Sequence, residues 1–229
     1  MKPSIVKPEI FINQPAGIGD IMFLEPIFRM LSKTHTVTVP IVDSFKWIEK
    51  HISYVNFVPY RCQFDNYDQE FTDKYLPLRF ASPIYRKYDL HDFSDYENCM
   101  LDKYRVLDLP EEMWMDMELI RDYSNENKLF EFLGSPKSFI LVNENSRVGD
   151  IRINIESNMR IIYMRPIEGF TLVDWCVMME RANENHHVST STFYLLNMLD
   201  VDATIYPRPS EDGLRGVSQM LPMTRFNSF

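Results

Sequence analysis

The sequence is short of cysteine. Its three cysteines, Cys62, Cys99 and Cys176, lie far apart, and no two of them form a Cys-x-x-Cys pair. So few cysteines exclude a disulfide framework, and their spacing does not suit a zinc ribbon or a dithiol redox motif. We therefore expect free, buried thiols in a protein of the reducing cytoplasm.

Long apolar runs and basic residues are also scarce. No stretch approaches the roughly 20 apolar residues of a membrane-spanning helix, and residues 1–9 lack the apolar core of a signal peptide. The 24 Lys and Arg residues against 33 Asp and Glu leave a formal net charge of −9. This charge argues against broad binding to nucleic-acid phosphates, although a local basic groove stays compatible with it. We expect a soluble, cytoplasmic protein without a membrane span.

Glycine is scarce too. Seven glycines in 229 residues are few for an α/β protein that binds a nucleotide, because phosphate-binding turns commonly use glycine. Apolar residues, in contrast, make up 45% of the chain and aromatic residues 14%. That is enough to bury real cores, so extended disorder is not expected. The length suits one large domain or two small ones.

Residues 10–58 alternate between strand and helix patterns. Strands are expected at 10–13, 36–42 and 54–58. Between the first two strands, apolar residues recur at helical spacing, at Ile21, Leu24, Ile27, Phe28 and Leu31. Pro26 should kink this helix or restrict it to the residues that follow. Asp43 or Ser44 should cap a second, short helix. This order predicts a Rossmann-like half with a parallel sheet.

The alternation restarts near Ser124, which should cap a helix that Gly134 ends. Thr171 and Asp174 have capping-box spacing before a further helix. Additional elements are expected as strands at 139–142, 159–164, 185–188 and 203–206, and as a helix from about residue 190. We predict an α/β protein of two Rossmann-like lobes, residues 1–122 and 123–229.

Residues 60–110 have no clear periodicity and are interrupted by prolines. A loop-rich insertion and a substrate-facing wall both fit this pattern, since loops often determine specificity. Within it, residues 79–88 interleave cations with aromatic side chains. Such a run can stack on a base or a sugar, or it can form a solvated face.

Two strand-to-helix turns have features of a binding site. The first contains Gly17, Gly19 and Asp20, and its two glycines indicate a close approach of the backbone to another group. The second, residues 189–192, is a run of four hydroxyl side chains at a helix start. These hydroxyls either cap the helix or, together with its first N–H groups and its dipole, form an anion site.

His186 and His187 precede the second turn. Because side chains alternate along a strand, one imidazole should enter the packing, and at most one should contact a ligand. No other His or Cys lies at metal-ligand spacing, so we expect no metal site.

Residues 17–26, Gly-Ile-Gly-Asp-Ile-Met-Phe-Leu-Glu-Pro, resemble the Gly-x-Gly-Asp-(four residues)-x-Pro opening of the ADP-heptose:lipopolysaccharide heptosyltransferase family. Residues 187–191, His-Val-Ser-Thr-Ser, are similar to that family's late strand–turn–helix, where small residues hold the donor pyrophosphate. The family's usual Gly-Pro-x-His run is absent, and the chain is shorter than typical members. The resemblance covers residues 1–58 and about the last 90 residues.

The resemblance implies a GT-B-type glycosyltransferase, in which two lobes face a cleft, and metal-independent transfer with inversion. It places the general base on Asp20 and puts Gly17 and Gly19 on the acceptor side. A carboxylate there can take the proton of the attacking hydroxyl. It also implies a nucleotide-diphosphate sugar as donor substrate, with no cofactor. Donor-binding residues are expected among Asn143, Ser146, Arg147, Arg152, His187, Ser189, Thr190 and Ser191.

Two questions stay open at this point. The acceptor is a saccharide or, in a small phage-encoded variant, a modified nucleic-acid base, and the net charge of −9 weighs against DNA. The scarce glycine and small size are compatible with a viral origin. The second question is whether the chain is a catalytically silent, GT-B-like module that binds a sugar or nucleotide or serves as a scaffold. In that case Asp20 only caps its helix.

Overall fold

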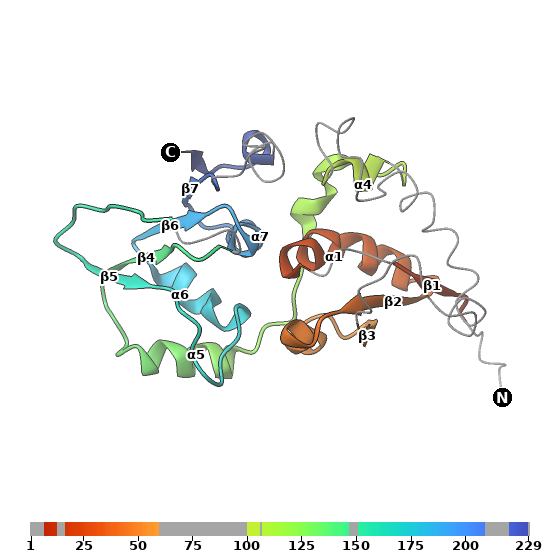
Figure 1. Ribbon diagram of the computed structural model, residues 1–229, viewed down its shortest axis with the longest axis horizontal. Helices are drawn as coiled ribbons and strands as arrows, with labels where there is room; N and C mark the ends of the chain where they lie inside the picture. Colours follow the sequence, from red (N-terminus) through yellow and green to blue (C-terminus); the bar gives the residue numbers. More distant parts are fainter. Residues whose placement is uncertain are drawn as a thin grey trace. The chain divides into compact units, whose positions relative to one another are not determined.

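The computed structural model describes residues 7–12, 17–59, 100–105, 107–146, 151–208 and 220–228. The chain divides into two compact units, Met1–Ile120 and Arg121–Phe229 (Figure 1). Each unit is built on a parallel sheet, which confirms the predicted α/β class. Cys62, Cys99, Arg147 and the cationic and aromatic run at 79–88 lie outside the described residues. The acceptor and donor roles assigned to the two halves stay predictions.

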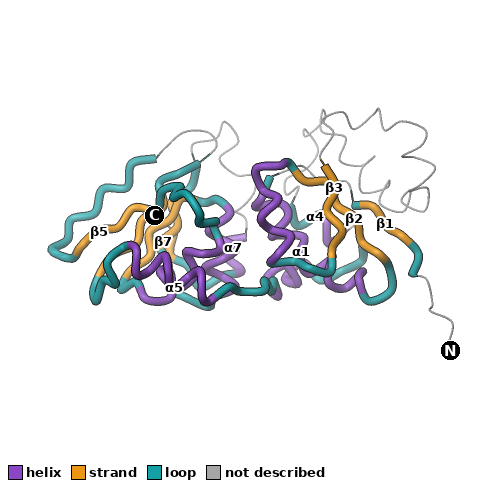
Figure 2. The backbone as a smooth tube through the Cα atoms, turned by 90° about the horizontal axis from the view of Figure 1, so that it is seen from below, coloured by secondary structure: helices purple, strands orange, loops and turns teal. Residues whose placement is uncertain are grey.

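The sheet of the first unit has three parallel strands in the order β1 (Glu9–Phe11), β2 (Thr36–Ile41) and β3 (Val55–Pro59), seen side by side in Figure 2. α1 (Ile18–Ser32) follows β1, and the 3₁₀ helix η1 (Asp43–Lys50) follows β2. Val37 pairs with both Ile10 and Val55, so apolar side chains of the three strands lie in one row. The short helices α4 (Asp102–Arg105) and η4 (Glu111–Asp116) belong to the same unit.

α1 is buried along residues 21–28. Apolar residues almost all around the helix explain this, because such a helix has no face suited to water. The helix continues through Pro26, so the predicted restriction to residues after the proline is wrong. A proline within a helix costs about 3 kcal/mol. Burial of large side chains on both sides of it, such as Phe23 and Phe28, offsets that cost.

The sheet of the second unit has five parallel strands in the order β5-β4-β6-β7-β8. These are β4 (Phe139–Asn143), β5 (Arg160–Tyr163), β6 (Glu184–Val188), β7 (Thr204–Tyr206) and β8 (Asn227–Ser228). The helical segments are α5 (Tyr123–Phe132), η5 (Val173–Trp175), α6 (Cys176–Arg181), α7 (Ser191–Met198) and η6 (Leu221–Met223). β8 is absent from the predicted elements because two residues are too few to show a periodic pattern.

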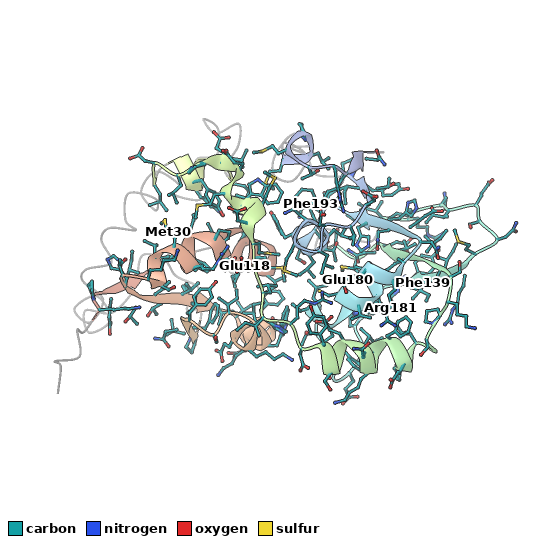
Figure 3. The ribbon with its side chains drawn as sticks, turned by 180° about the vertical axis from the view of Figure 1, so that it is seen from behind. Met30, Glu118, Phe139, Glu180, Arg181 and Phe193 are labelled. Atoms are coloured by element: carbon teal, nitrogen blue, oxygen red, sulfur yellow. The ribbon has the colours of Figure 1, made fainter. Side chains whose placement is uncertain are left out.

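The two faces of this sheet are covered in different ways. On one face, Asn185 and Asn143 donate hydrogen bonds to α6 and α7. Phe193 of α7 is fully buried on the inside of that helix (Figure 3). On the opposite face, the extended segment 151–159 packs on the sheet, and the core there consists of Ile140, Val142, Ile153 and Val188. Helices therefore cover one face, and a strap of alternating isoleucines covers the other.

One local signal in this unit is confirmed and one is confirmed in part. The backbone N–H and the hydroxyl of Thr171 both donate to Asp174 Oδ2, at 2.6 and 2.8 Å, which is one half of the predicted capping box. The other half is not formed, because the Asp174 N–H bonds to the Thr171 carbonyl and no side chain caps η5. Gly134 follows the last turn of α5 with φ of +86°, a left-handed conformation that glycine adopts without steric cost.

The predicted N-caps of two helices are wrong. Asp122, and not Ser124, caps α5, because its side chain accepts the Asn125 N–H at 3.0 Å. Asp and Ser are about equally good caps, so the sequence contained two candidates two residues apart. No side chain caps η1, so neither Asp43 nor Ser44 has the predicted role.

A buried carboxylate ties three parts of the first unit together. Glu25 of α1 has no exposed surface and accepts hydrogen bonds from the Tyr54 hydroxyl, from Arg29 Nε at 3.1 Å and from the Glu118 N–H at 2.8 Å. Burial raises the pKa of the Glu25 carboxyl, and the hydrogen bonds to its charged form oppose that effect. Through these hydrogen bonds, Glu25 attaches the chain around Tyr54 and the chain around Glu118 to α1.

His187 of β6 is a buried polar residue of a different kind. Its side chain has no exposed surface, and neither ring nitrogen has a hydrogen-bond partner in the part of the chain that the structure describes. Burial, assisted by the neighbouring His186, lowers the pKa of His187 to about 3. The imidazole is therefore neutral in the folded protein at all but strongly acidic pH.

Replacing Glu25 by Ala should lower the free energy of unfolding by about 2–4 kcal/mol, since the Tyr54 hydroxyl and the Glu118 N–H lose a buried partner. Denaturant unfolding of the purified variant measures this. Glu118→Ala is the matched control, because its side chain also pairs with Arg29 but is 72% exposed. We expect an effect of about 0.5 kcal/mol or less there. Equal effects of the two substitutions would contradict a special role for Glu25.

Stability should fall as the pH is lowered from about 6.5 toward 3, because the unfolded chain binds a proton at His187 that the folded protein does not. The sign follows from a folded-state pKa below the unfolded one. The contribution approaches about 1.4 kcal/mol per pH unit within this window. His187→Phe should reduce the slope of unfolding free energy against pH by that amount. An unchanged slope would show that the imidazole is not buried in its neutral form.

Candidate functional site

Asp20 lies at the start of α1, after the carboxyl end of β1. Gly17 is the N-cap residue and Asp20 is the third residue of the helix, so the alternative in which Asp20 is the N-cap is wrong. Its position in the first turn still suits a carboxylate, because the N-terminal end of a helix is electropositive. The side chain is 28% exposed, so a ligand can reach it.

Gly17 makes room for this carboxylate. A Cβ atom placed on Gly17 would lie 2.6 Å from Asp20 Oδ2, closer than real Cβ contacts come. The Gly17 backbone itself is extended, with φ of −73° and ψ of 137°, so glycine is needed here for space and not for its dihedral freedom. Gly19 is the second residue of α1, directly before Asp20.

Lys103 is the side chain that the sequence did not indicate. Its ammonium lies 3.2 Å from Asp20 Oδ1, and the residue is only 8% exposed. It comes from α4, 83 positions further along the chain. Lys103 belongs to no motif, and only packing of α4 against α1 brings it to Asp20.

In the second unit, the strand order itself indicates where a ligand would bind. Relative to the chain, the order β5-β4-β6-β7-β8 is second, first, third, fourth, fifth, as in flavodoxin-like sheets. β5, the next strand in the chain, lies on one side of β4, and β6, the strand after it, lies on the other side of β4. In such sheets ligands bind at the carboxyl ends of the strands, where this reversal occurs. Here that point lies between Asn143 and Val188, the last residues of β4 and β6.

Asn143 links the two strand ends at this point. Its Nδ2 donates to the hydroxyl oxygens of Thr190 and Thr192, each at 3.2 Å, and its Oδ1 accepts the Asn145 N–H at 3.2 Å. Asn143 and Thr190 were both predicted site residues, and the structure brings them together. Thr192 was not among the predicted donor-binding residues, although it lies two positions after Thr190 in the same run of hydroxyls.

The hydroxyls of the second turn do not cap α7 in the usual way. Thr190 is its N-cap residue, but its side chain makes no bond to an α7 N–H and bonds instead to the Val188 carbonyl at 3.3 Å. Ser189 is 5% exposed, and its hydroxyl accepts the Arg208 N–H at 3.2 Å. Ser191 is the first residue of the helix. The Thr190 hydroxyl therefore leaves the first N–H groups of α7 without a side-chain cap. Uncapped N–H groups at a helix start are what an anion site needs.

The two histidines alternate as the sequence predicted. His186 is partly exposed, with Nδ1 at 3.1 Å from the Tyr206 hydroxyl and Nε2 at 3.0 Å from Glu184. His187 lies on the other face, in register with Asn143, and is fully buried. In this structure its ring offers no surface to a ligand.

Arg165 is a cation near the switch point that sequence reasoning did not select. It follows β5, and its guanidinium lies 3.3 Å from Glu144 Oε2 and 3.2 Å from Asn145 Oδ1. The Arg165 side chain is 47% exposed, so part of its guanidinium group stays accessible to a ligand. Arg152, which was predicted, is exposed on the strap at 151–159 between isoleucines that face the sheet. Ser146 is half-buried just beyond Asn145.

Three further features bear on function: a metal site, a membrane span and a reactive cysteine. Within the described ranges, no three His, Cys, Asp or Glu side chains are placed to hold a metal ion. None of the described helices combines the length and apolar composition of a membrane span. Cys176 is a free, buried thiol, and burial raises its pKa, so this cysteine behaves as a small apolar residue.

Comparison with known proteins shows a likeness of fold. No family model and no curated protein matches this sequence. Among solved structures, the chain is similar to the crystal structure of the glycosyl transferase family 9 from Veillonella parvula DSM 2008, with a TM-score of 0.52. The likeness covers 90% of this chain and 83% of that chain at 9% sequence identity. At so low an identity, what the two proteins share is the α/β fold with parallel sheets.

Proposed function

We propose that this protein is a glycosyltransferase, which moves a sugar from a nucleotide-diphosphate donor to an acceptor hydroxyl with inversion and without a metal. The observation that supports it most directly is Asp20. An accessible carboxylate stands at the end of the first strand of a fold shared with a glycosyl transferase. The proposal includes the GT-B-type fold that the sequence resemblance implies.

The donor diphosphate binds at the start of α7. The N–H groups of the first helical turn and the helix dipole are suited to an anion, and ligands of sheets with this strand order commonly bind where the order reverses. Arg165 is proposed to assist, because its guanidinium contacts Glu144 and Asn145, directly after the end of β4. Arg147 and Arg152 stay predictions for this role. Ser189 is proposed to hold the turn through the Arg208 N–H and not to contact the donor directly.

Asp20 acts as the general base. Its carboxylate takes the proton of the acceptor hydroxyl while that oxygen bonds to the anomeric carbon. The bond from the anomeric carbon to the diphosphate oxygen breaks in the same displacement, and its electron pair leaves with the diphosphate. The N-terminal dipole of α7 and a cationic side chain stabilise that leaving charge. The acceptor is a saccharide or, if the protein is phage-encoded, a modified nucleic-acid base.

Ser191→Pro tests the donor site at the backbone. Proline is tolerated as the first residue of a helix, so the fold should survive while one N–H disappears. We expect the affinity for ADP, UDP or GDP, whichever wild type binds best, to fall by about tenfold or more in calorimetry, as expected for a lost hydrogen bond to a charged group. Ser191→Ala is the control, since it removes only the hydroxyl. Equal affinities of all three proteins would place the diphosphate elsewhere.

Asp20→Asn tests the chemistry. Asn keeps the size of the side chain and removes its basicity, so the variant should fold, bind nucleotide as wild type does and lose transfer by at least about 100-fold. The assay is release of nucleoside diphosphate from a panel of ADP-, UDP- and GDP-sugars with saccharide acceptors. Asp43→Asn is the matched control, because Asp43 is also an acidic residue in a first helical turn of this unit. Near-wild-type turnover of Asp20→Asn would favour the silent binding module.

A further inference from the structure

The ion pair between Lys103 and Asp20 is not an ordinary surface contact. The lysine side chain is 10% exposed and the aspartate side chain 28%. Lysine is rarely this buried unless it is paired, because removing an ammonium from water is costly. A Met or Leu would fill the same space against Met100 and Phe23 without that cost. The charge at position 103 therefore calls for an explanation beyond packing.

α4 is clamped to α1 directly beside this pair. The hydroxyl of Tyr104 donates to the Phe23 carbonyl at 2.5 Å, and the two rings meet edge to face with centroids 5.1 Å apart. Trp114 lies against the same Phe23 ring, at 6.2 Å. Tyr104 and Phe23 have no exposed surface. Tyr104 is the next residue after Lys103, so its contacts with Phe23 also fix the backbone of Lys103. The Lys103 side chain therefore extends toward Asp20 from a fixed backbone position.

The second carboxylate oxygen lies beside Gly17. Lys103 Nζ engages Oδ1, whereas Oδ2 lies where a Cβ atom on residue 17 would be only 2.6 Å away. Because glycine has no Cβ atom, Oδ2 can occupy this place while Oδ1 holds the ammonium. A side chain at position 17 would displace Oδ2 and disturb the orientation that the ion pair with Lys103 favours.

We infer that Lys103 is a positioning residue for Asp20, which rests on the proposed function of Asp20 as general base. By holding Oδ1, the ammonium presents Oδ2 to the acceptor hydroxyl. The proton passes from that hydroxyl to Oδ2, and Lys103 keeps its own protons throughout. Displacement of a reacting group by about 1 Å can cost about 100-fold in rate, so orientation of this kind has a measurable value.

The test begins with Lys103→Met, which keeps the length of the stem and removes the ammonium. Turnover in the nucleoside diphosphate release assay should fall by about 10- to 100-fold, with the donor KM within about twofold of wild type. In an Asp20→Asn background, Lys103→Met should have no further effect, because Lys103 acts through Asp20. Ethylammonium should restore turnover to Lys103→Ala, whereas tetramethylammonium, which cannot donate a hydrogen bond, should not.

Gly17→Ala approaches the same carboxylate from the opposite side and leaves Lys103 untouched. It should lower turnover with little change in melting temperature, since the dihedrals of Gly17 suit alanine and, among the described residues, the added Cβ would come close only to Asp20. This variant keeps the inference testable if Lys103→Met does not fold. Wild-type turnover in both variants would overturn it.

A measurement without turnover separates this inference from the proposed function. Three-bond NMR couplings from the Asp20 carboxyl carbon to the backbone report its χ1 rotamers. Wild type should show one rotamer, and Lys103→Met should show averaging over several. Suppose that wild type transfers no sugar, but that the Asp20 side chain has one χ1 rotamer in wild type and several in Lys103→Met. The proposed function is then wrong, and the positioning of Asp20 by Lys103 is still supported. A single rotamer in both proteins overturns the positioning whatever the activity.

Discussion

Parallel pairing of the strands is the constraint on which both candidate sites depend. A parallel strand must be reached by a crossover, so every strand of a sheet ends at the same edge, where the next turn and helix begin. β1 therefore delivers the Gly17–Asp20 turn to the start of α1. β4 and β6 deliver Asn143 and the hydroxyl turn to one another. The strand order reverses beside β4, and in sheets of this kind ligands commonly bind at such a reversal.

Buried polar side chains hold this framework in place, and most of them are paired. Asn143 joins two strand ends to α7, and Glu25 joins α1 to two distant segments. Because an unpaired buried polar group costs about 1–3 kcal/mol, such contacts specify which segments meet as well as stabilising them. His187 departs from this rule, since neither of its nitrogens has a partner among the described residues. Burial keeps its imidazole neutral, and its two unpaired nitrogens reduce the stability of the folded protein.

A fold shared at 9% identity places elements in space but not the chemistry of their side chains. The proposed sugar transfer therefore depends on a few residues of this chain. Asp20 is accessible, fits over a glycine and faces an ammonium. The start of α7 keeps N–H groups that its N-cap side chain does not satisfy.

Local patterns in the sequence determined the class of fold, the positions of most strands and helices, and some of their ends. The bond between Thr171 and Asp174, the left-handed Gly134 and the alternation of His186 and His187 along one strand all follow from local backbone geometry or from contacts within a few residues. Tertiary structure decided the partners: Lys103 for Asp20 across 83 positions, and the carboxylate of Glu25 for Tyr54 and Glu118. It also favoured Arg165 over Arg152 at the sheet edge. Interactions within one or two helical turns leave a periodic trace in the sequence, whereas a contact between distant segments depends on register and packing, which no single stretch of residues encodes.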